Sequence, residues 1–339
     1  MDRIWAALGS ARAEIRSDVP EVLDVVRAAL PRADGGGEAD ARITVSRTPG
    51  RSRFADEAGG NGEGVFRFEE GIVYRYDPER QRYSVTVRDA AWGEIDMAGC
   101  SATWLVARPM LPRSLLHSLV LDPLSLMLPL RGVLICHGAA VVAQDGATLL
   151  LGPSGSGKST LTYLLSGGGI PGGLRPLTDD TMVLDFMGEA VRVFPIRSGF
   201  GLPESLHPGG SEADFGGPAL QSSHGKVYVP KLPGTADGPH AVRRVAFLCK
   251  GASEEDRTEL VPLGRAEARW HLLDGQSVIP SPGMVHRVGF MDRLALQASA
   301  VRVAYGERCD VGALRDFAAG AVSGMPFAGG GPGIWRCWN

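Results

Sequence analysis

The spacing of apolar residues changes along the first part of the chain from a helical period to a strand period. Apolar residues recur three and four positions apart over residues 19–31, which predicts a helix with Pro20 in its first turn. After a glycine-rich stretch at 33–39, apolar and polar residues alternate. This alternation predicts strands at 42–47, 65–68, 72–76 and 83–87, with a turn at Glu69-Glu70-Gly71. Residues 1–108 are therefore expected to form a small α+β domain.

From residue 109 to residue 328, stretches with a helical period alternate with short apolar runs. The pattern predicts helices at 115–128, 159–165, 291–300 and 311–322, and strands at 133–136, 139–143, 147–151, 181–185, 191–196, 242–249 and 301–305. The Gln144-Asp145-Gly146 turn should join two of these strands as a hairpin, because Asp-Gly is a strong tight-turn signal. We expect an α/β (α+β) fold for this part and a flexible tail at 329–339.

Composition and charge exclude several classes of protein. Of the 339 residues, 44 % are hydrophobic and 22 % are charged, as in ordinary folded proteins, and the formal net charge of −3 gives no electrostatic reason to bind nucleic acid or an acidic membrane. The most apolar stretch, 115–136, is interrupted by Asp122, Pro123 and Arg131, and the N-terminus has no signal-peptide layout. We expect a cytoplasmic protein without a membrane or nucleic-acid partner.

The cysteines indicate neither a disulfide framework nor a zinc site. They are odd in number, scattered and without a CxxC pair, which suits a reducing compartment; they are Cys100, Cys136, Cys249, Cys309 and Cys337. A pairing of Cys309 with Cys337 stays open at this stage.

The segment with the clearest chemistry is the phosphate-loop motif G-x-x-x-x-G-K-[ST], which follows the strand predicted at 147–151. Glycines allow successive backbone N–H groups to point at phosphate oxygens, and the following helix adds its N-terminal dipole. The expected nucleotide-binding residues are Gly152, Ser154, Gly155, Ser156, Gly157, Lys158, Ser159 and Thr160. Lys158 should reach the phosphates of ATP, with GTP as the alternative, and Ser159 should bind Mg²⁺.

Two adjacent carboxylates, Asp179 and Asp180, follow the loop by about twenty residues. Phosphoryl transfer needs a carboxylate near Mg²⁺, and often a second one to accept the proton of the attacking hydroxyl. By itself, such a pair is more typical of a solvated turn before a strand.

The order of these motifs resembles the HPr kinase/phosphorylase family, and more closely the HPr-kinase-like peptide kinases of biosynthetic clusters, such as lasso-peptide tailoring kinases. The residues that carry the resemblance are the run from His137-Gly138 to Val142, Asp145-Gly146, the phosphate loop and Asp179-Asp180. The likeness covers roughly residues 115–200 and is weaker beyond. It implies a P-loop domain of the HPr kinase and phosphoenolpyruvate carboxykinase type, with a mixed sheet.

The resemblance implies roles for individual residues. Asp179 would be the base toward a seryl hydroxyl, Asp180 would help to hold the metal, and His137 would lie near the transferred phosphate. Arg197, in the segment Phe194 to Gly199, would contact phosphate, although a surface arginine after a strand is an equal alternative. Lys226, in a chain with few lysines, is a candidate phosphate or substrate contact.

The chain departs from HPr kinase at Pro195, where that family carries a glutamate before the arginine. The resemblance therefore does not extend to phosphorylase activity or to HPr as the acceptor. HPr kinases assemble into rings, which leaves a homo-oligomer open.

Three functions follow from these observations. The first is a kinase that uses ATP and Mg²⁺ to phosphorylate a serine of a peptide or protein, such as a biosynthetic precursor peptide, with residues 1–108 in substrate recognition. The second is a small-molecule kinase on the same fold, and the third is a nucleotide-binding regulator without transfer chemistry.

Overall fold

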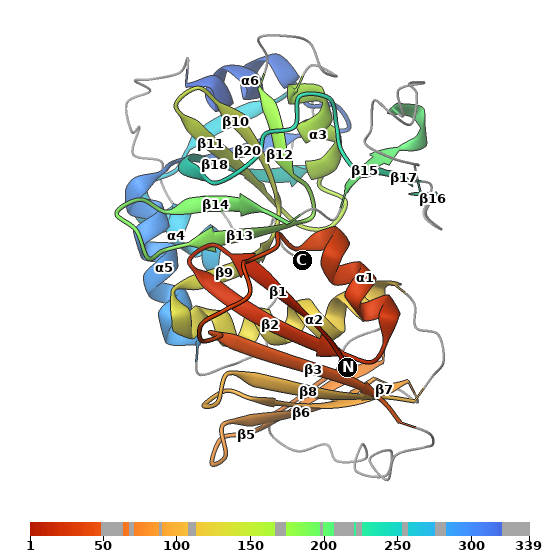
Figure 1. Ribbon diagram of the computed structural model, residues 1–339. Helices are drawn as coiled ribbons and strands as arrows, with labels where there is room; N and C mark the ends of the chain where they lie inside the picture. The colour runs from red at the N-terminus through yellow and green to blue at the C-terminus, as the bar shows by residue number, and fades with distance from the viewer. Residues whose placement is uncertain are drawn as a thin grey trace. The chain divides into compact units, whose positions relative to one another are not determined.

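The computed structural model is summarised in Figure 1. It describes residues 1–48, 64–67, 71–87, 90–107, 113–166, 174–196, 199–206, 220–221, 226–252, 257–274 and 283–320. The chain divides into two compact units, Met1–Ile135 with Val278–Arg287, and Cys136–Ser277 with Val288–Asn339. The boundary between the units along the chain therefore follows residue 135, whereas the sequence predicts that the second part begins near residue 108. The reason is that the helix following residue 112 packs within the N-terminal unit.

The N-terminal unit is built on one eight-stranded sheet, in the order β1-β2-β3-β8-β7-β6-β5-β4. Its strands are β1 (Asp2–Leu8), β2 (Ala11–Ser17), β3 (Ala41–Arg47), β4 (Val65–Arg67), β5 (Ile72–Asp77), β6 (Arg82–Val87), β7 (Ala91–Asp96) and β8 (Ser101–Val106). The β2–β3 and β3–β8 pairs are parallel and the other pairs are antiparallel. The sequence analysis assigned no element to residues 1–18 or to β7 and β8, so it missed half of these strands.

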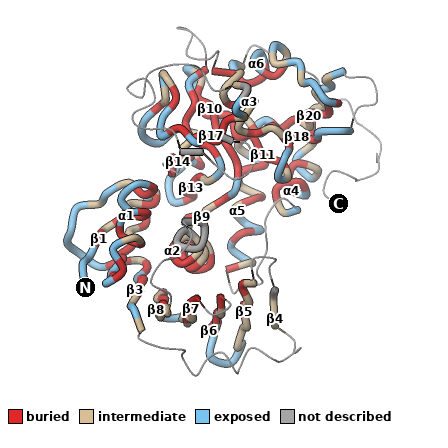
Figure 2. The backbone as a smooth tube through the Cα atoms, turned by 90° about the vertical axis from the view of Figure 1, so that its right-hand side faces the viewer, coloured by how far each residue is buried: buried red, intermediate tan, exposed pale blue. Residues whose placement is uncertain are grey.

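Two helices cover one face of this sheet: α1 (Pro20–Ala29) and α2 (Arg113–Met127), which continues into the short 3-10 helix η2 (Leu128–Arg131). They pack against each other, α1 on β1 and β2 and α2 on β3 and β8 (Figure 1). In Figure 2 the buried side of α1 stands out from its exposed side. The predicted helix at 19–31 is confirmed, and Pro20 stands in its first turn.

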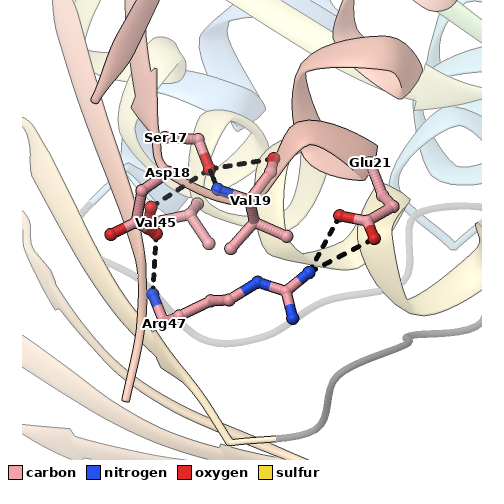
Figure 3. Close-up of polar contacts among 6 residues, drawn as sticks. All are labelled: Ser17, Asp18, Val19, Glu21, Val45 and Arg47. Carbon is pink, nitrogen blue, oxygen red and sulfur yellow. Dashed lines mark hydrogen bonds and ion pairs between the residues drawn. The ribbon is translucent and has the colours of Figure 1, made fainter. Parts of the chain in front are cut away.

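Polar contacts fasten the start of α1 to the sheet (Figure 3). The buried hydroxyl of Ser17 accepts a hydrogen bond from the backbone N–H of Val19 (2.9 Å) and donates to the carbonyl of Val45 (3.1 Å). The backbone N–H of Arg47 donates to Asp18 (2.7 Å), and its guanidinium pairs with Glu21 (3.2 Å). These bonds join β2, α1 and β3. They therefore fix the orientation in which α1 begins on the face of the sheet.

The second unit is built on a nine-stranded mixed sheet. Its main path runs β12-β10-β11-β18-β14-β13-β9, and β20 extends it by pairing with β18 and β19. The strands are β9 (Val133–His137), β10 (Ala139–Ala143), β11 (Gly146–Leu151), β12 (Arg175–Thr178), β13 (Thr181–Asp185), β14 (Arg192–Pro195), β18 (His240–Lys250), β19 (Glu259–Pro262) and β20 (Ser299–Tyr305). The chain passes from one unit to the other within β9.

A smaller sheet, in the order β15-β17-β16, joins this unit, with strands β15 (Phe200–Pro203), β16 (Leu220–Gln221) and β17 (Lys226–Val229). The short helix η4 (Glu204–Leu206) follows β15. The remaining helices are α3 (Lys158–Leu165), α4 (Arg265–Asp274), α5 (Met284–Gln297) and α6 (Val311–Ala319). The predicted strand at 181–185 is confirmed, whereas α4, β12 and the three strands of the small sheet were not predicted.

The core of the second unit lies between the sheet and helices α3 and α6. All six residues of β11 are buried, and Leu161 and Leu165 of α3 pack with Leu314 and Phe317 of α6 in the same cluster. Several helix bounds differ from expectation. The helix α5 begins seven residues before the predicted position, 291, and ends at residue 297, before the predicted 300. The helix α6 ends at residue 319 because Gly320 adopts a left-handed conformation (φ 79°).

The described residues therefore form a mixed α+β structure, as expected. Their helices include none that is long and apolar enough to cross a membrane. Among the described residues, no disulfide joins Cys100, Cys136, Cys249 or Cys309. Cys337, the turn at residues 69 and 70, and the predicted tail at 329–339 lie outside the described residues.

The pair of Gly93 on β7 and Trp104 on β8 offers a test of the N-terminal core. The two residues are cross-strand partners, and a Cβ atom at Gly93 would lie 2.3 Å from the buried indole ring. We expect Gly93→Ala to lower the free energy of unfolding by about 1–3 kcal/mol, because the ring cannot move without disturbing packed neighbours. Urea denaturation followed by circular dichroism measures this change.

The matched control is Gly289→Ala in α5, where an added Cβ meets no atom within 4 Å. This substitution should raise stability by about 0.5–1 kcal/mol, because alanine is the better helix former. Equal effects at the two positions would contradict the close packing of Gly93 against Trp104.

Candidate active site

The candidate site begins where the buried strand β11 ends. This strand pairs with β10 through the predicted hairpin, antiparallel, and with β18, parallel. The two-residue turn is held by Arg244, whose guanidinium donates to Asp145 (3.0 Å) and lowers the pKa of that carboxyl through this hydrogen bond. The hairpin therefore delivers residue 152 at the carboxyl end of parallel strands, where ligands bind in open α/β sheets.

The phosphate loop has glycine where its backbone requires it. Gly155 and Gly157 adopt left-handed conformations (φ 81° and 77°), and Gly157 is the N-cap residue immediately before helix α3. A Cβ atom at Gly152 would lie 2.8 Å from the carbonyl oxygen of Leu248 on β18 and 2.6 Å from the hydroxyl of Ser156. The predicted strand, loop and helix are thus present in the expected order.

The predicted phosphate-binding side chains differ in exposure. Lys158 is buried (7 % exposed), and its ammonium donates to the carbonyls of Gly152 (2.8 Å) and Pro153 (2.9 Å). Ser154 is exposed, whereas Ser159 and Thr160 are half-buried on the first turn of α3. The ammonium of Lys158 therefore binds backbone carbonyls of the phosphate loop itself.

A tyrosine outside the motif forms a hydrogen bond to the phosphate loop. Tyr305, the last residue of β20, donates from its hydroxyl to the carbonyl oxygen of Ser156. The same hydroxyl would lie 3.2 Å from a Cβ atom at Gly157. Sequence analysis missed this residue, since nothing in the strand pattern at 301–305 distinguishes its side chain from a core position.

The first residue of the acid pair is buried. Asp179 is 2 % exposed, and its carboxylate accepts a hydrogen bond from the backbone N–H of Gly201 (3.0 Å). Desolvation raises its pKa to about 6, against the lowering effects of the Gly201 N–H and of the Ser159 side chain. The carboxylate therefore lies near the first turn of the phosphate-loop helix, which carries Ser159.

The second residue of the pair faces solvent. Asp180 has a left-handed backbone (φ 70°), and its carbonyl accepts from the N–H of Gly138 (3.0 Å). Its carboxylate oxygen lies 3.3 Å from the Nδ1 atom of His137, and both side chains are at least half exposed. The structure thus brings His137 together with the acid pair.

The side chain of Tyr228 on β17 also lies near the acid pair. It is the strand partner of Gly201, and its ring lies so close that a Cβ atom on Gly201 would be 3.0 Å from it. Although Tyr228 is exposed, the pKa of its phenol is raised by partial burial and then by the negative charges of Asp180 and Asp179. Its proximity depends on the pairing of β15 with β17, which no local motif announces.

Two predicted contacts cannot be placed beside these residues. Arg197 lies outside the described residues, and Lys226 begins β17 but its side chain is not described. Their roles stay predictions. Within the described ranges, no group of three or more His, Cys, Asp and Glu side chains is arranged to hold a metal ion.

Comparisons with known proteins add little to this geometry. No family model and no curated protein matches the chain. Among solved structures, the HPr(Ser) kinase/phosphatase from Coxiella burnetii matches 55 % of this chain and 95 % of its own, with 13 % sequence identity and a TM-score of 0.29. Such a low TM-score does not establish a shared fold, so the resemblance to HPr kinases stays a hypothesis carried by the motifs.

The buried carboxylate of Asp179 generates a prediction about stability and pH. Its pKa in the folded state, about 6, exceeds that of an unfolded aspartate, so the folded state holds the proton between roughly pH 4 and pH 6. Stability contributed by this group is complete below that window and is lost as the pH rises through it. We expect Asp179→Asn to be more stable than the wild type at pH 7.5, by about 2 kcal/mol, and to lose this advantage at pH 4.

Urea denaturation at several pH values checks this expectation. Asp316→Asn, which removes an exposed carboxylate on α6, is the control and should change stability by only a few tenths of a kcal/mol. A stability difference for Asp179→Asn that does not vary with pH would contradict the raised pKa.

Proposed function

We propose that the chain is a kinase that transfers the γ-phosphate of ATP to a hydroxyl group, specifically a serine of a peptide or protein. The observation that carries the proposal is the proximity of the phosphate loop and the acid pair. The Ser159 side chain, on the first turn of the helix that follows the loop, lowers the pKa of the buried Asp179 carboxyl, so a phosphate cradle and a candidate base lie near each other.

The residues present fit a bound nucleotide. The left-handed glycines 155 and 157 and the absent side chain at Gly152 leave a cradle lined by backbone. The Oγ atom of Ser156 is buried and has no hydrogen-bond partner within the described part of the chain. Lys158, which donates only to loop carbonyls in its described bonds, can transfer those donors to phosphate oxygens. The loop can therefore accept an anion without rearranging β11.

Residues of the chain would divide the work as follows. Lys158 and the loop N–H groups would hold the phosphates, and Ser159 with Asp180 would hold Mg²⁺. Mg²⁺-bound ATP supplies the electrophilic phosphoryl group. Arg197 and Lys226 stay candidate phosphate contacts, and His137 would orient the Asp180 carboxylate through its ring nitrogen. ATP is preferred over GTP only by the family resemblance.

Asp179 suits the role of general base. A carboxylate with a pKa of about 6 is ionised in most molecules at neutral pH and is still more basic than an ordinary aspartate. It can therefore accept the proton of an approaching hydroxyl, and its hydrogen bond from the backbone N–H of Gly201 keeps it oriented. Most of the rate would come from this positioning and from charge stabilisation by the cationic side chains.

Removal of the Tyr305 hydroxyl tests the phosphate loop. We expect Tyr305→Phe to bind Mg²⁺-ATP and inorganic pyrophosphate about threefold to tenfold more weakly, because the loop carbonyl of Ser156 loses one hydrogen bond. Isothermal titration calorimetry measures both affinities. Tyr163→Phe is the matched control. Tyr163 packs against the hydrophobic cluster of Phe200, Leu202, Val229 and Leu232, so loss of its hydroxyl should leave both affinities unchanged. Wild-type protein that binds neither ligand would contradict the nucleotide site itself.

Transfer of labelled phosphate tests the chemistry. With Mg²⁺ and γ-labelled ATP, wild-type protein should label a serine in peptides encoded beside its own gene. Asp179→Asn should lower the rate at least about a hundredfold, as expected for loss of a general base, while its affinity for ATP changes little. Lys158→Ala should lose both activity and nucleotide affinity.

The acceptors and the control separate the alternatives. Asp316→Asn should retain full activity. Label on a metabolite pool and not on peptides would indicate a small-molecule kinase, and HPr serves as a further acceptor. ATP binding without transfer to any acceptor would contradict the kinase and leave a nucleotide-dependent regulator.

A further inference from the structure

One face of the N-terminal sheet carries an unusual set of side chains. On β1, β2 and β3, the small and aliphatic residues that point toward helices α1 and α2 alternate with residues of the opposite face. The register pairs Trp5 with Glu14, Arg3 with Arg16, and Glu14 with Arg42, so these side chains share that opposite face. The set, called here the arginine face, consists of Arg3, Trp5, Arg12, Glu14, Arg16 and Arg42.

A buried carboxylate organises the arginine face. Glu14 is 3 % exposed and accepts hydrogen bonds from the guanidinium groups of Arg3 (3.3 Å) and Arg16 (2.9 and 3.0 Å). The guanidinium of Arg42 lies 3.8 Å from its other oxygen. All three arginine side chains are nevertheless about half exposed, with values of 57, 50 and 49 %. One carboxylate thus holds three cationic groups in place while their outer edges face solvent.

A fourth arginine extends the face along β2. The guanidinium of Arg12 lies 5.2 Å from the ring centroid of Trp5, and that of Arg3 lies 5.9 Å from it. Arg12 also donates to the carbonyl of Asp34 (2.5 Å), which fixes its position. The indole is half-buried between the two cations, so a flat apolar surface lies beside the charged groups.

Positive charge is in excess on this surface. Three guanidinium groups surround the carboxylate of Glu14, and a fourth, that of Arg12, lies on the same face, where the carboxylate of Asp40 binds the Arg12 backbone N–H (2.9 Å). These four guanidinium groups outnumber the two carboxylates by two. On β6 and β7, by contrast, the single arginine Arg82 pairs with two carboxylates, those of Glu94 and Asp96.

We propose that the arginine face is a docking surface for an acidic peptide segment. Guanidinium groups bind carboxylates through paired N–H donors, and groups that are already ordered lose little conformational entropy when they bind. Trp5 would pack against an apolar or glycine-rich stretch of the same segment. A peptide is favoured over nucleic acid because these guanidinium groups already pair with the carboxylate of Glu14, the kind of acceptor that an acidic peptide carries.

The role of this surface in catalysis rests on the proposed function, whereas the binding itself does not. If the chain is a peptide kinase, the arginine face would hold acidic residues of the acceptor that are remote from the phosphorylated serine. Such remote binding raises the effective concentration of the serine without taking part in the chemistry.

Fluorescence anisotropy with the full-length protein tests the binding. The probe is a labelled peptide of about twelve residues in which Asp and Glu alternate with Gly and Ser. A peptide with Asn and Gln in place of the acids, and oligouridylate of equal length, are the comparisons. The acidic peptide should bind at least about tenfold more tightly than the neutral one, and its affinity should fall as salt is raised, because exposed charges are screened.

Variants locate the surface. The double variant Arg3→Gln/Arg42→Gln should weaken binding of the acidic peptide about tenfold or more. Arg16 is retained so that Glu14 keeps a charged partner. Arg27→Gln/Arg80→Gln is the control, since it removes the same charge from two exposed, ion-paired arginines outside the arginine face. Arg12→Gln, which makes no contact with Glu14 in the described bonds, should weaken binding about threefold and covers the case in which the double variant unfolds.

Each outcome separates this inference from the proposed function. Equal affinity in all variants, or tighter binding of oligouridylate than of the acidic peptide, would overturn the docking surface. Binding of the acidic peptide that is lost only in the arginine-face variants supports it, even where no phosphate is transferred. Mg²⁺-ATP affinity, measured alongside, should be the same in every variant.

Discussion

The buried carboxylate of Asp179 lies where three segments of the second unit approach one another. Asp179, in the turn between β12 and β13, accepts a hydrogen bond from the backbone N–H of Gly201 on β15, and the Ser159 side chain on α3 lies close enough to lower its pKa. Desolvation raises its pKa to about 6, so the folded protein keeps this group at an energetic cost that an amide or an apolar residue would avoid. Groups retained at such a cost are often found at functional sites, because a shifted pKa favours proton transfer in a reaction even where it lowers stability. The phosphate loop and the small sheet take their positions around this group.

The glycine next to His137 shows how backbone packing serves the same site. A Cβ atom at Gly138 would lie 2.5 Å from the side chain of Met182 and 2.7 Å from that of Leu151, so only glycine lets the chain approach so closely. Its N–H then donates to the carbonyl of Asp180, whose left-handed conformation aspartate tolerates better than most residues. As a consequence, the imidazole of His137 lies beside the carboxylate of Asp180. The His-Gly and Asp-Asp motifs thus belong to one packing arrangement.

Local signals predicted the elements that display glycine and turn chemistry, but they missed strands with a weak strand pattern and contacts between segments far apart in the sequence. The hairpin at Asp145, the phosphate loop and the start of α3 rest on glycines and turns that the sequence displays directly. In contrast, β1 and β2 place alanines such as Ala6 and Ala13 at buried positions, and alanine has a weak preference for strands. Tyr228 was missed because it reaches the acid pair only through the register of β15 and β17. Tyr305 was missed for a similar reason, since its partner is 149 residues away.

The two adjacent aspartates have opposite surroundings, and this difference decides how the site can work. Asp180 has a left-handed backbone (φ 70°), and the turn formed by residues 179 and 180 buries one carboxylate and exposes the other. Asp179 is buried and bound by the N–H of Gly201, whereas Asp180 is exposed to solvent beside His137. Burial raises the pKa of Asp179, as is typical of groups that act as a base in pairs with unequal surroundings. The pair can therefore offer a buried, basic carboxylate and an exposed carboxylate near the same phosphate loop.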